Sequence, residues 1–522
     1  MARLVVVGFA ASCDLAEHPV APEAGPTVAA HQSGGHDYYV SPSGSDTNPC
    51  TSTSPCYTMK RVSEFLGPGD VAHFLAGAYT WDSAQVVTRS GTASARVTYR
   101  SDVQWGAKIT VTGTYNGSCG VVKNTGDYVD IIGFDMTGPA TCANGLLQDG
   151  NHGRIIGNRV RDLPGTNGYA GILVDCCEPY DLTGNEVISN VVDNIGPFGQ
   201  TNLIHGIYLA GPGNMAVNNI VTRAAAACIT SWHGATRLVI ANNVVANCGK
   251  YGIQVSADGT IGANDSTTVI NNIIVKTGRF GIQEWFTVGS HNVYYNNIVY
   301  DNPEGHLVIR GGGTESGTII LDSGQFDSLF VNYTGDRTGD YRLWSGDVAL
   351  DAGTTSCAAG VSSCVVPTDF DGVTRPLGTA YDIGAYETGM RVTSLGAIGS
   401  GSAAPRSDRQ DFDIDVTNAP GGRLVVRDFT FVRSDGSVAA LMADRAEDPA
   451  TGVSSFTKTS AACAQLSGTG RLDTGQLVDF TLDACDNGTP GSGVDFLSLS
   501  VPGFAYSKSG TLSEGEITIS RF

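Results

Sequence analysis

Gly252-Ile-Gln-Val-Ser256 and Gly281-Ile-Gln-Glu-Trp285 are two copies of one phrase that recurs between about Ala143 and Asn302. Each copy begins with a small residue and continues with apolar residues that alternate with others. The earlier copies are Gly145–Asp149, Gly171–Asp175, Gly206–Ala210 and Cys228–Trp232. Short strands that repeat every 20 to 50 residues or so indicate a solenoid. We therefore predict a right-handed parallel β-helix, in which residues far apart in sequence share one surface.

Paired-asparagine steps separate the strands. They are Gly157-Asn158, Gly184-Asn185, Asn218-Asn219, Asn242-Asn243, Asn271-Asn272 and Asn296-Asn297. Stacked side-chain amides hydrogen-bond along a ladder, and asparagine tolerates tight-turn geometry. We expect these residues to be structural.

Composition narrows the class of protein. The chain has 522 residues, 68 of them glycine, and only 16% are charged, which suits a turn-rich β protein. Its formal charge of −20 argues against nucleic-acid binding, because phosphate contacts need clustered cations. The same charge repels polyanionic glycans unless a basic patch or a metal intervenes. No apolar run approaches the roughly 18 residues that span a bilayer.

The N-terminus predicts export. Arg3 precedes the apolar stretch Leu4–Ala11, and Ser12-Cys13-Asp14 follows. Residues 1–13 resemble a bacterial lipoprotein signal with Cys13 as the lipidated membrane anchor, although Ala10 stands where that motif usually has leucine. An ordinary export signal and an apolar tail without function remain alternatives. Residues 14–36 are rich in proline and alanine and are predicted to form a linker.

Thirteen cysteines favour an oxidising compartment. Short loops predict three local pairs, and Cys119 with Cys142 is a further candidate. The three local pairs are Cys50–Cys56, Cys357–Cys364 and Cys463–Cys485. Cys176, Cys177, Cys228 and Cys248 are expected to be small core residues of the stack.

Two terminal segments resemble a known family. Tyr38-Tyr-Val-Ser-Pro-Ser-Gly-Ser-Asp46, with Pro68-Gly-Asp70 and Gly77-Ala-Tyr79, resembles the N-terminal cap of secreted bacterial β-helix proteins of the pectate-lyase-like superfamily. Asp382-Ile-Gly-Ala-Tyr-Glu387 resembles their C-terminal signature. This resemblance implies a β-helix domain over residues 37–388. The activities of such proteins vary, so the resemblance transfers little chemistry.

Residues 390–522 have a different sequence pattern from the preceding repeats. Alternating strands such as Phe412–Val416, Leu424–Phe431 and Phe496–Val501 predict a separate antiparallel β-sandwich. It resembles the accessory domain that follows such β-helices in related secreted proteins.

The repeat places specific side chains in columns. If the residue after each glycine or cysteine points inward, one buried stack is Leu146, Ile172, Ile207, Ile229, Ile253 and Ile282. One outward column is Leu147, Leu173, Tyr208, Thr230, Gln254 and Gln283. A second outward column is Asp149, Asp175, Ala210, Trp232, Ser256 and Trp285.

The outward columns predict a sugar-binding groove. Trp232 and Trp285 offer flat apolar faces for a pyranose ring, and Gln254, Gln283 and His233 offer directional hydrogen bonds. The alternative is that exposed columns merely stabilise the stack.

Asp149 and Asp175 are predicted to lie one coil apart, about 5 Å. Such a pair can share a proton, bind Ca²⁺ or act as the two carboxylates of a retaining glycosidase. It can also be two solvated turn residues.

Lys250 and Arg279 occupy equivalent positions before two of the strands. As neighbouring cations they could serve β-elimination from a uronate, with lysine as base and arginine as charge stabiliser. The alternative is two exposed turn residues. His205 with Tyr208, and His233, are further acid/base candidates. Ser231-Trp-His-Gly234 resembles the Arg-His-Gly element of alginate and chondroitin lyases, but Trp232 replaces its arginine, so the lyase catalytic set is not carried over.

We therefore predict an exported protein that binds an extracellular polysaccharide. The first hypothesis is cleavage by elimination or hydrolysis. The second is a non-catalytic surface or adhesive module that leaves the polymer intact.

Overall fold

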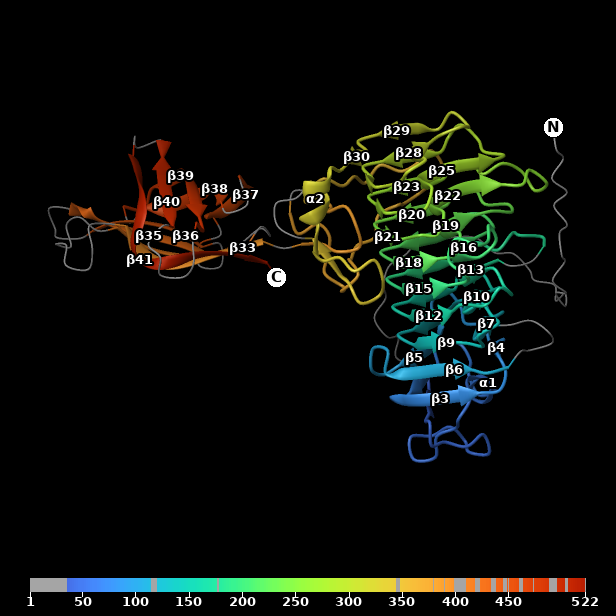
Figure 1. The fold of residues 1–522 in the computed structure, drawn as a ribbon. Helices are drawn as coiled ribbons and strands as arrows, with labels where there is room; N and C mark the ends of the chain where they lie inside the picture. The colour runs from blue at the N-terminus through green and yellow to red at the C-terminus, as the bar shows by residue number, and fades with distance from the viewer. Residues whose placement is uncertain are drawn as a thin grey trace. The chain divides into compact units, whose positions relative to one another are not determined.

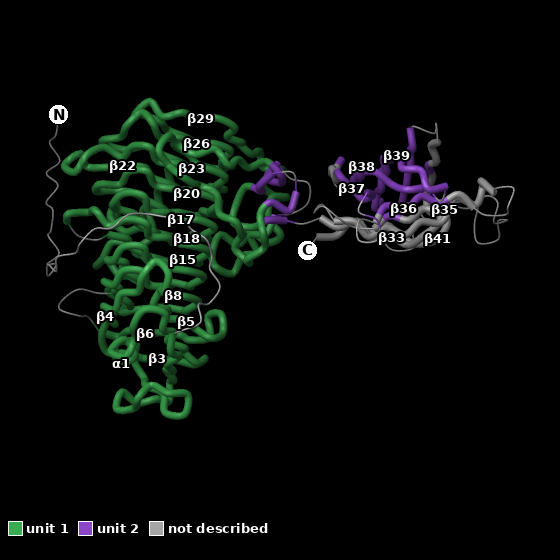
Figure 2. The backbone as a smooth tube through the Cα atoms, turned by 180° about the vertical axis from the view of Figure 1, so that it is seen from behind, with its two compact units in different colours: residues 1–342, 352–375, 383–386 green, residues 343–351, 376–382, 387–522 purple. Residues whose placement is uncertain are grey.

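The computed structural model describes residues 35–113, 120–175, 178–343, 348–378, 380–388, 390–398, 410–417, 423–432, 438–444, 448, 450–459, 463–472, 474–487, 495–502 and 506–521. The predicted signal with Cys13, most of the linker, and Cys119, Cys176 and Cys177 lie outside these ranges. The chain divides into two compact units (Figure 2). One comprises the chain up to Arg342 with Ala352–Arg375 and Ile383–Tyr386, and the other comprises Leu343–Asp351, Pro376–Asp382 and Glu387–Phe522.

The first unit is a parallel β-helix with three long sheets (Figure 1). We name each sheet by its first strand. The β1 sheet contains β1 (Asp37–Val40), β2 (Val71–Phe74), β5 (Val97–Ser101), β8 (Val129–Ile132), β11 (Arg154–Ile156), β14 (Glu186–Ile188), β17 (Met215–Val217), β20 (Val239–Ala241), β23 (Thr268–Ile270), β26 (Val293–Tyr295) and β29 (Thr314–Ser316). The β3 sheet contains β3 (Gly77–Trp81), β6 (Ala107–Val111), β9 (Asp135–Thr137), β12 (Arg159–Leu163), β15 (Val191–Ile195), β18 (Ile220–Ala224), β21 (Val244–Ala246), β24 (Ile273–Val275), β27 (Ile298–Tyr300) and β30 (Ile319–Ile320).

The β4 sheet contains β4 (Gln85–Val87), β7 (Val122–Asn124), β10 (Leu146–Gln148), β13 (Ala170–Val174), β16 (His205–Leu209), β19 (Ala227–Ser231), β22 (Tyr251–Ala257), β25 (Phe280–Phe286) and β28 (Gly305–Val308). The described residues also form two short helices, α1 (Met59–Ser63) and α2 (Ser323–Asp327), and the strand pair β31 (Phe330–Asn332) and β32 (Asp340–Leu343), of which Leu343 belongs to the second unit. Each chain turn adds one strand to each sheet, so the predicted winding is confirmed.

The predicted inward stack is confirmed. Leu146, Ile172 and Ile207 are register partners along the β4 sheet, and Ile229, Ile253 and Ile282 continue the column. All six side chains are fully buried. Burial of one branched aliphatic side chain per coil contributes about 1.5–3 kcal/mol each.

The second residue of each two-residue step builds a spine between the β1 and β3 sheets. Each asparagine donates both its backbone N–H and its side-chain Nδ2–H to the Oδ1 of the asparagine in the following coil, at 2.8–3.2 Å. The spine consists of Asn158, Asn190, Asn219, Asn243, Asn272 and Asn297.

One predicted step was wrong. Gly184-Asn185 lies in the connection before β14, where Asn185 N donates to Asn214 Oδ1 at 2.8 Å. The spine passes instead through Ser189-Asn190 after β14, because the step must connect a β1-sheet strand to a β3-sheet strand.

The first residue of each step has positive φ, and in four successive coils it is asparagine. Asn218, Asn242, Asn271 and Asn296 have φ of 50–56°. Their Nδ2 groups donate to the carbonyls of Thr368, Gly384, Thr354 and Ala352, respectively, at 2.7–3.2 Å. These acceptors belong to Ala352–Arg375 and Ile383–Tyr386, which we call the crossing segment. The outer asparagines therefore anchor a segment distant in sequence.

Four disulfides lie within the described residues. Cys50–Cys56, Cys357–Cys364 and Cys463–Cys485 confirm the three local predictions. Cys228 and Cys248 are buried as expected, but the prediction that they are merely small core residues was wrong, since they form a fourth disulfide with Cα atoms 5.5 Å apart. The coil brings two positions 20 residues apart within bonding range.

The described residues of the second unit form nine antiparallel strands. They are β33 (Met390–Ile398), β34 (Gln410–Thr417), β35 (Arg423–Val432), β36 (Val438–Asp444), β37 (Gly452–Lys458), β38 (Cys463–Leu472), β39 (Leu477–Cys485), β40 (Phe496–Val501) and β41 (Tyr506–Arg521). Its buried cluster includes Leu424, Leu466, Phe480, Leu482 and Leu497. β36 also pairs with β38, which links the two ends of the sheet. A separate antiparallel region is confirmed, and its arrangement as a sandwich stays a prediction.

Candidate functional site

The outward row of the β4 sheet follows the predicted register. Register partners run from Leu147 through Leu173, Tyr208, Thr230, Gln254 and Gln283 to Val308. Leu173, Thr230, Gln254 and Gln283 are nonetheless at least 90% buried. Thr230 Oγ1 donates to Gln254 Oε1 at 3.3 Å, whereas Gln283 Oε1 receives no hydrogen bond from any described group. From Leu147 to Val308 this row carries no charged side chain, and the register partner of Leu147 in β7 is Lys123.

Three aromatic side chains form a contiguous row beside it. Phe286 meets Trp232 and Trp285 edge-on, with ring centroids 5.3 Å apart in both pairs. Trp285 is 36% exposed and Phe286 is 60% exposed. The Arg310 guanidinium lies 4.8 Å from the Trp285 ring. We call Trp232, Phe286 and Trp285 the aromatic row.

The length of β25 explains this row. β22 and β25 each have seven residues, and their pairing continues through Ser256–Trp285 to Ala257–Phe286. The predicted neighbours Ser256 and Trp285 are therefore confirmed as register partners. Phe286 was missed because the repeated phrase was taken to end one residue earlier.

His233 is held by a carboxylate and an aromatic ring. Its Nδ1 lies 2.9 Å from Asp258 Oδ2, and the Tyr180 ring stacks on it with centroids 4.2 Å apart. The contact is electrostatic, because the geometry at Nδ1 is not that of a hydrogen bond. With Nδ1 next to the Asp258 carboxylate, Nε2 is the nitrogen left to accept a proton. Burial lowers the pKa of His233, and the Asp258 carboxylate opposes that shift. The imidazole is consequently neutral at pH 7.

Asp258 is ionised at that pH. Burial opposes ionisation, but hydrogen bonds from Thr260 and the neighbouring His233 hold the pKa of Asp258 below its usual value. Sequence analysis missed Tyr180 and Asp258. The signal in the sequence that could have found them is the length of the connections between strands. The connections 175–185 and 258–267 are longer than the connection 149–153 in an earlier coil.

Tyr208 lies close to this group. Burial raises the pKa of Tyr208 well above its usual value, and the nearby Tyr180, Asp258, Tyr169 and Asp175 raise it further. The phenol is therefore a proton donor rather than a phenolate at neutral pH.

His205 is a different case. It is 5% exposed, and its Nδ1 accepts a hydrogen bond from the Ala227 backbone at 3.3 Å. Burial lowers the pKa of His205 to about 3. The ring centroids of His205 and Tyr208 are 5.7 Å apart, so the two predicted partners are brought together. A neutral, buried imidazole with a main-chain partner suits a structural role.

The two aspartates of the second column have separate environments. Lys123 Nζ lies 2.8 Å from Asp149 Oδ2. Asp175 is 1% exposed, and its Oδ2 accepts a hydrogen bond from Leu182 N at 3.0 Å. Burial raises the pKa of Asp175 to about 8, and the charge of Asp149 adds to the shift.

This donor set does not fit the predicted calcium site. A protonated Asp175 and a lysine-paired Asp149 are poor ligands for a hard cation. Among the described residues, no group of three or more His, Cys, Asp or Glu side chains could hold a metal ion.

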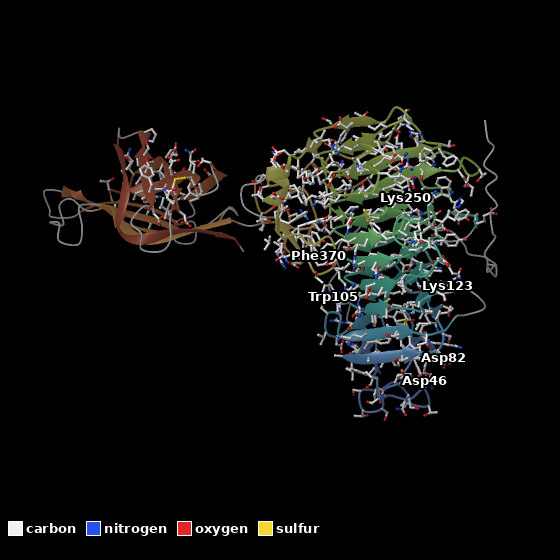
Figure 3. All side chains as sticks on the ribbon, viewed as in Figure 1. Asp46, Asp82, Trp105, Lys123, Lys250 and Phe370 are labelled. Atoms are coloured by element: carbon white, nitrogen blue, oxygen red, sulfur yellow. A yellow bond between two sulfur atoms is a disulfide. The ribbon has the colours of Figure 1, made fainter. Side chains whose placement is uncertain are left out.

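The Lys250 and Arg279 backbones are neighbours, since Arg279 N donates to Lys250 O at 2.7 Å. Their side chains bond elsewhere. Lys250 Nζ donates to Asn202 Oδ1 at 2.7 Å, in the connection before β16. Arg279 forms two hydrogen bonds with Glu304 and lies 3.1 Å from the Tyr251 hydroxyl. Figure 3 shows Lys250 and Lys123 at different levels of the coil stack. Both side chains of the predicted elimination pair, Lys250 and Arg279, are therefore hydrogen-bonded to other side chains of the protein.

No protein-family model matches the chain, and no curated protein matches it. Among solved structures it is similar to pectate lyase Pel9A, with 16% identity, a TM-score of 0.48, and coverage of 67% of this chain and 96% of that one. It is also similar to a mannuronic acid specific polysaccharide family 6 lyase from human gut microbiota, with 16% identity, a TM-score of 0.37, and coverage of 55% and 59%. A glycoside hydrolase shows 8% identity, a TM-score of 0.38, and coverage of 55% and 96%. Likeness at this level concerns the fold.

Within the described residues, no helix has the length and apolar character required to cross a membrane.

Proposed function

We propose that this protein is exported, binds an extracellular polysaccharide along the outer face of the β4 sheet, and cleaves it beside Tyr208 and His233. The observation that carries the proposal is the 2.9 Å approach of His233 Nδ1 to Asp258 Oδ2 next to the aromatic row. The Trp232 and His233 ring centroids are 6.1 Å apart. A sugar stacked on this row would lie next to an oriented imidazole.

The proposed roles follow from the environments. His233 Nε2 accepts a proton, Asp258 and Tyr180 orient the imidazole, and the Tyr208 hydroxyl donates a proton. The aromatic row supplies apolar platforms for sugar rings, and Gln254 and Gln283 are the hydrogen-bonding candidates. We assign no proton transfer to His205, Lys250 or Arg279, because each is bonded within the protein.

The test is a glycan panel assayed for new reducing ends and for unsaturated ends that absorb in the ultraviolet. His233→Gln should lower the turnover rate by about 10²- to 10⁴-fold, the usual contribution of a general acid or base. His291 provides a matched control, because its Nδ1 also lies 2.8 Å from a carboxylate, that of Asp265, but its side chain is largely exposed. His291→Gln should leave turnover unchanged. Equal activity of parent and His233→Gln would reject the assignment.

A non-catalytic binding protein is the second candidate. The observation that favours it is that three of the four predicted catalytic side chains, His205, Lys250 and Arg279, are hydrogen-bonded within the protein. If this second candidate is correct, the protein binds the polymer and leaves it intact, Trp285→Ala reduces the binding, and the unsubstituted protein releases no product. The four disulfides suit export under either candidate. Anchoring through Cys13 stays a prediction.

A further inference from the structure

The charges around the proposed reaction centre are of one sign. The carboxyl groups that act on Tyr208 are Asp258 and Asp175, and those that act on His233 are Asp258 and Glu178. Of these, Asp175 is protonated at neutral pH, because burial raises its pKa to about 8. Asp175 in turn feels Asp149 and Asp181. Among the described residues, no lysine or arginine forms an ion pair with Asp258, Asp175 or Glu178, and Lys123 pairs with Asp149.

The cations of the same face are held elsewhere. Lys123 pairs with Asp149, and Arg279 pairs with Glu304. Lys250 bonds to the neutral side chain of Asn202. These contacts remove the cations that could otherwise offset the carboxylates near Tyr208.

Arg310 stands at the far end of the aromatic row. The sequence of contacts runs from His233 to Trp232, then to Phe286, Trp285 and finally the Arg310 guanidinium. Three aromatic side chains thus separate this cation from the imidazole. Arg310 is not placed to neutralise a carboxylate on the sugar that reacts.

From this charge pattern we infer that the sugar bound beside Tyr208 and His233 is neutral, and that the reaction there is hydrolysis rather than β-elimination. The inference rests on the proposed function. A uronate at this position would meet the ionised Asp258 carboxylate, which lies 2.9 Å from His233 and has no lysine or arginine paired with it among the described residues, and this costs binding free energy at low dielectric. β-Elimination needs an acidic proton next to a carboxylate, and a neutral sugar has none.

The hydrolytic step balances with the groups present and one water molecule. The glycosidic C–O bond breaks, and a bond forms between the anomeric carbon and the water oxygen. His233 Nε2 takes one proton from the water, and the leaving oxygen takes the Tyr208 hydroxyl proton. A proton returned from His233 to the phenolate through solvent restores both side chains.

The experiment compares the full chain on neutral polymers (mannan, arabinoxylan, β-glucan) and on uronate polymers (polygalacturonate, alginate). We expect binding and new reducing ends from a neutral polymer, no ultraviolet-absorbing product from any polymer, and a binding constant that changes by less than about twofold between low and high salt. Tighter binding of a uronate polymer, or any unsaturated product, would overturn this inference but leave the proposed carbohydrate function standing. Failure to bind any polymer on the panel would overturn both.

A charge reversal gives a second readout. Glu178 acts electrostatically on His233 but has no assigned role in the reaction. Glu178→Lys should raise affinity for a uronate polymer by at least about tenfold and leave affinity for the neutral polymer within about twofold. Glu315→Lys reverses an exposed charge in β29 of another sheet and should change neither affinity. Equal effects of the two variants would count against a local charge filter.

Discussion

Asn271 and Thr354 exchange two hydrogen bonds although they are 83 residues apart. Asn271 Nδ2 donates to the Thr354 carbonyl, and Thr354 N donates to Asn271 Oδ1, both at 2.8 Å. The exchange fastens the crossing segment to the corner between the β1 and β3 sheets. The first asparagine of a paired step therefore anchors the crossing segment, whereas the second asparagine belongs to the spine.

Asn271→Gly should weaken this attachment without straining the backbone. Glycine adopts the φ of 56° found at Asn271, but it lacks the amide that makes both hydrogen bonds. We expect the free energy of unfolding to fall by about 1–3 kcal/mol. Four of the five tryptophans, Trp81, Trp105, Trp232 and Trp285, belong to the first unit, so tryptophan fluorescence in denaturant reports mainly on that unit.

Ser189→Gly is the control for this variant. Ser189 occupies the equivalent corner of another coil with φ of 53°, and its backbone N–H donates to Val217 O in the neighbouring coil at 3.0 Å. Hydrogen exchange in the crossing segment should quicken in Asn271→Gly and not in Ser189→Gly. Identical exchange in both variants would contradict the anchoring role.

Asp175→Asn should make the β-helix more stable at alkaline pH. The pKa of Asp175 is about 8 in the folded chain and close to 4 when unfolded. The folded state therefore keeps a proton that the unfolded state releases, and parent stability falls as pH rises from about 4 to about 8. Asparagine removes this loss, a gain on the order of 2–5 kcal/mol at pH 8.

The measurement is the denaturation midpoint of parent and variant at pH 4 and pH 8. The two proteins should agree at pH 4 and separate at pH 8. Asp149→Asn serves for comparison, because it removes only the smaller contribution that the Asp149 charge makes to the Asp175 pKa and also removes the partner of Lys123, so any gain at pH 8 should be much smaller. A constant difference between parent and Asp175→Asn across this range would refute the assigned titration.

Asp258→Asn should move the acidic limb of the pH–rate profile. The Asp258 carboxylate favours protonated His233, so its removal lowers the pKa of His233 further. The base then stays neutral to lower pH, and the acidic limb shifts in that direction. We expect the maximal rate to drop by about tenfold or more, because the imidazole loses its orienting partner. Rates measured between pH 4 and pH 8 test both effects.

A purely structural role for Asp258 would lower the amount of folded protein and leave the position of the acidic limb unchanged. Asp265→Asn, at the exposed His291 pair, should alter neither rate nor profile.

Phe286→Ala should weaken glycan binding by about tenfold, because it removes the exposed ring that contacts both tryptophans. Ile320→Ala is the matched control, since Ile320 is also 60% exposed but lies in β30 of the β3 sheet. Isothermal titration with the best polymer from the panel gives both constants. Equal losses in the two variants would remove the aromatic row from the binding site.

The winding and the order of the columns could be predicted from the chain alone. Strand alternation and a repeated glycine set the register, and the register determines which backbone positions are adjacent. Tyr208, Gln254 and Gln283 were therefore placed correctly in one row. The error at Gly184-Asn185 arose because two turns in the same coil both contain asparagine.

Which side chains contact one another could not be predicted from that periodicity. Tyr180 and Asp258 lie in connections of irregular length, where no repeat relates sequence position to location. Lys250 and Arg279 were correctly placed as backbone neighbours, but side chains with several rotatable bonds choose their partners from the surrounding loops.

The sequence by itself determined a coiled stack of short parallel strands, because two-residue periodicity and a recurring turn depend only on local stereochemistry. The tertiary structure alone decided that His233 faces Asp258, that Asp175 is buried, and that the outer asparagines hold residues from beyond position 350. Those relationships depend on how loops of unequal length fold across neighbouring coils, and loop conformation follows from packing and charge rather than from a repeat.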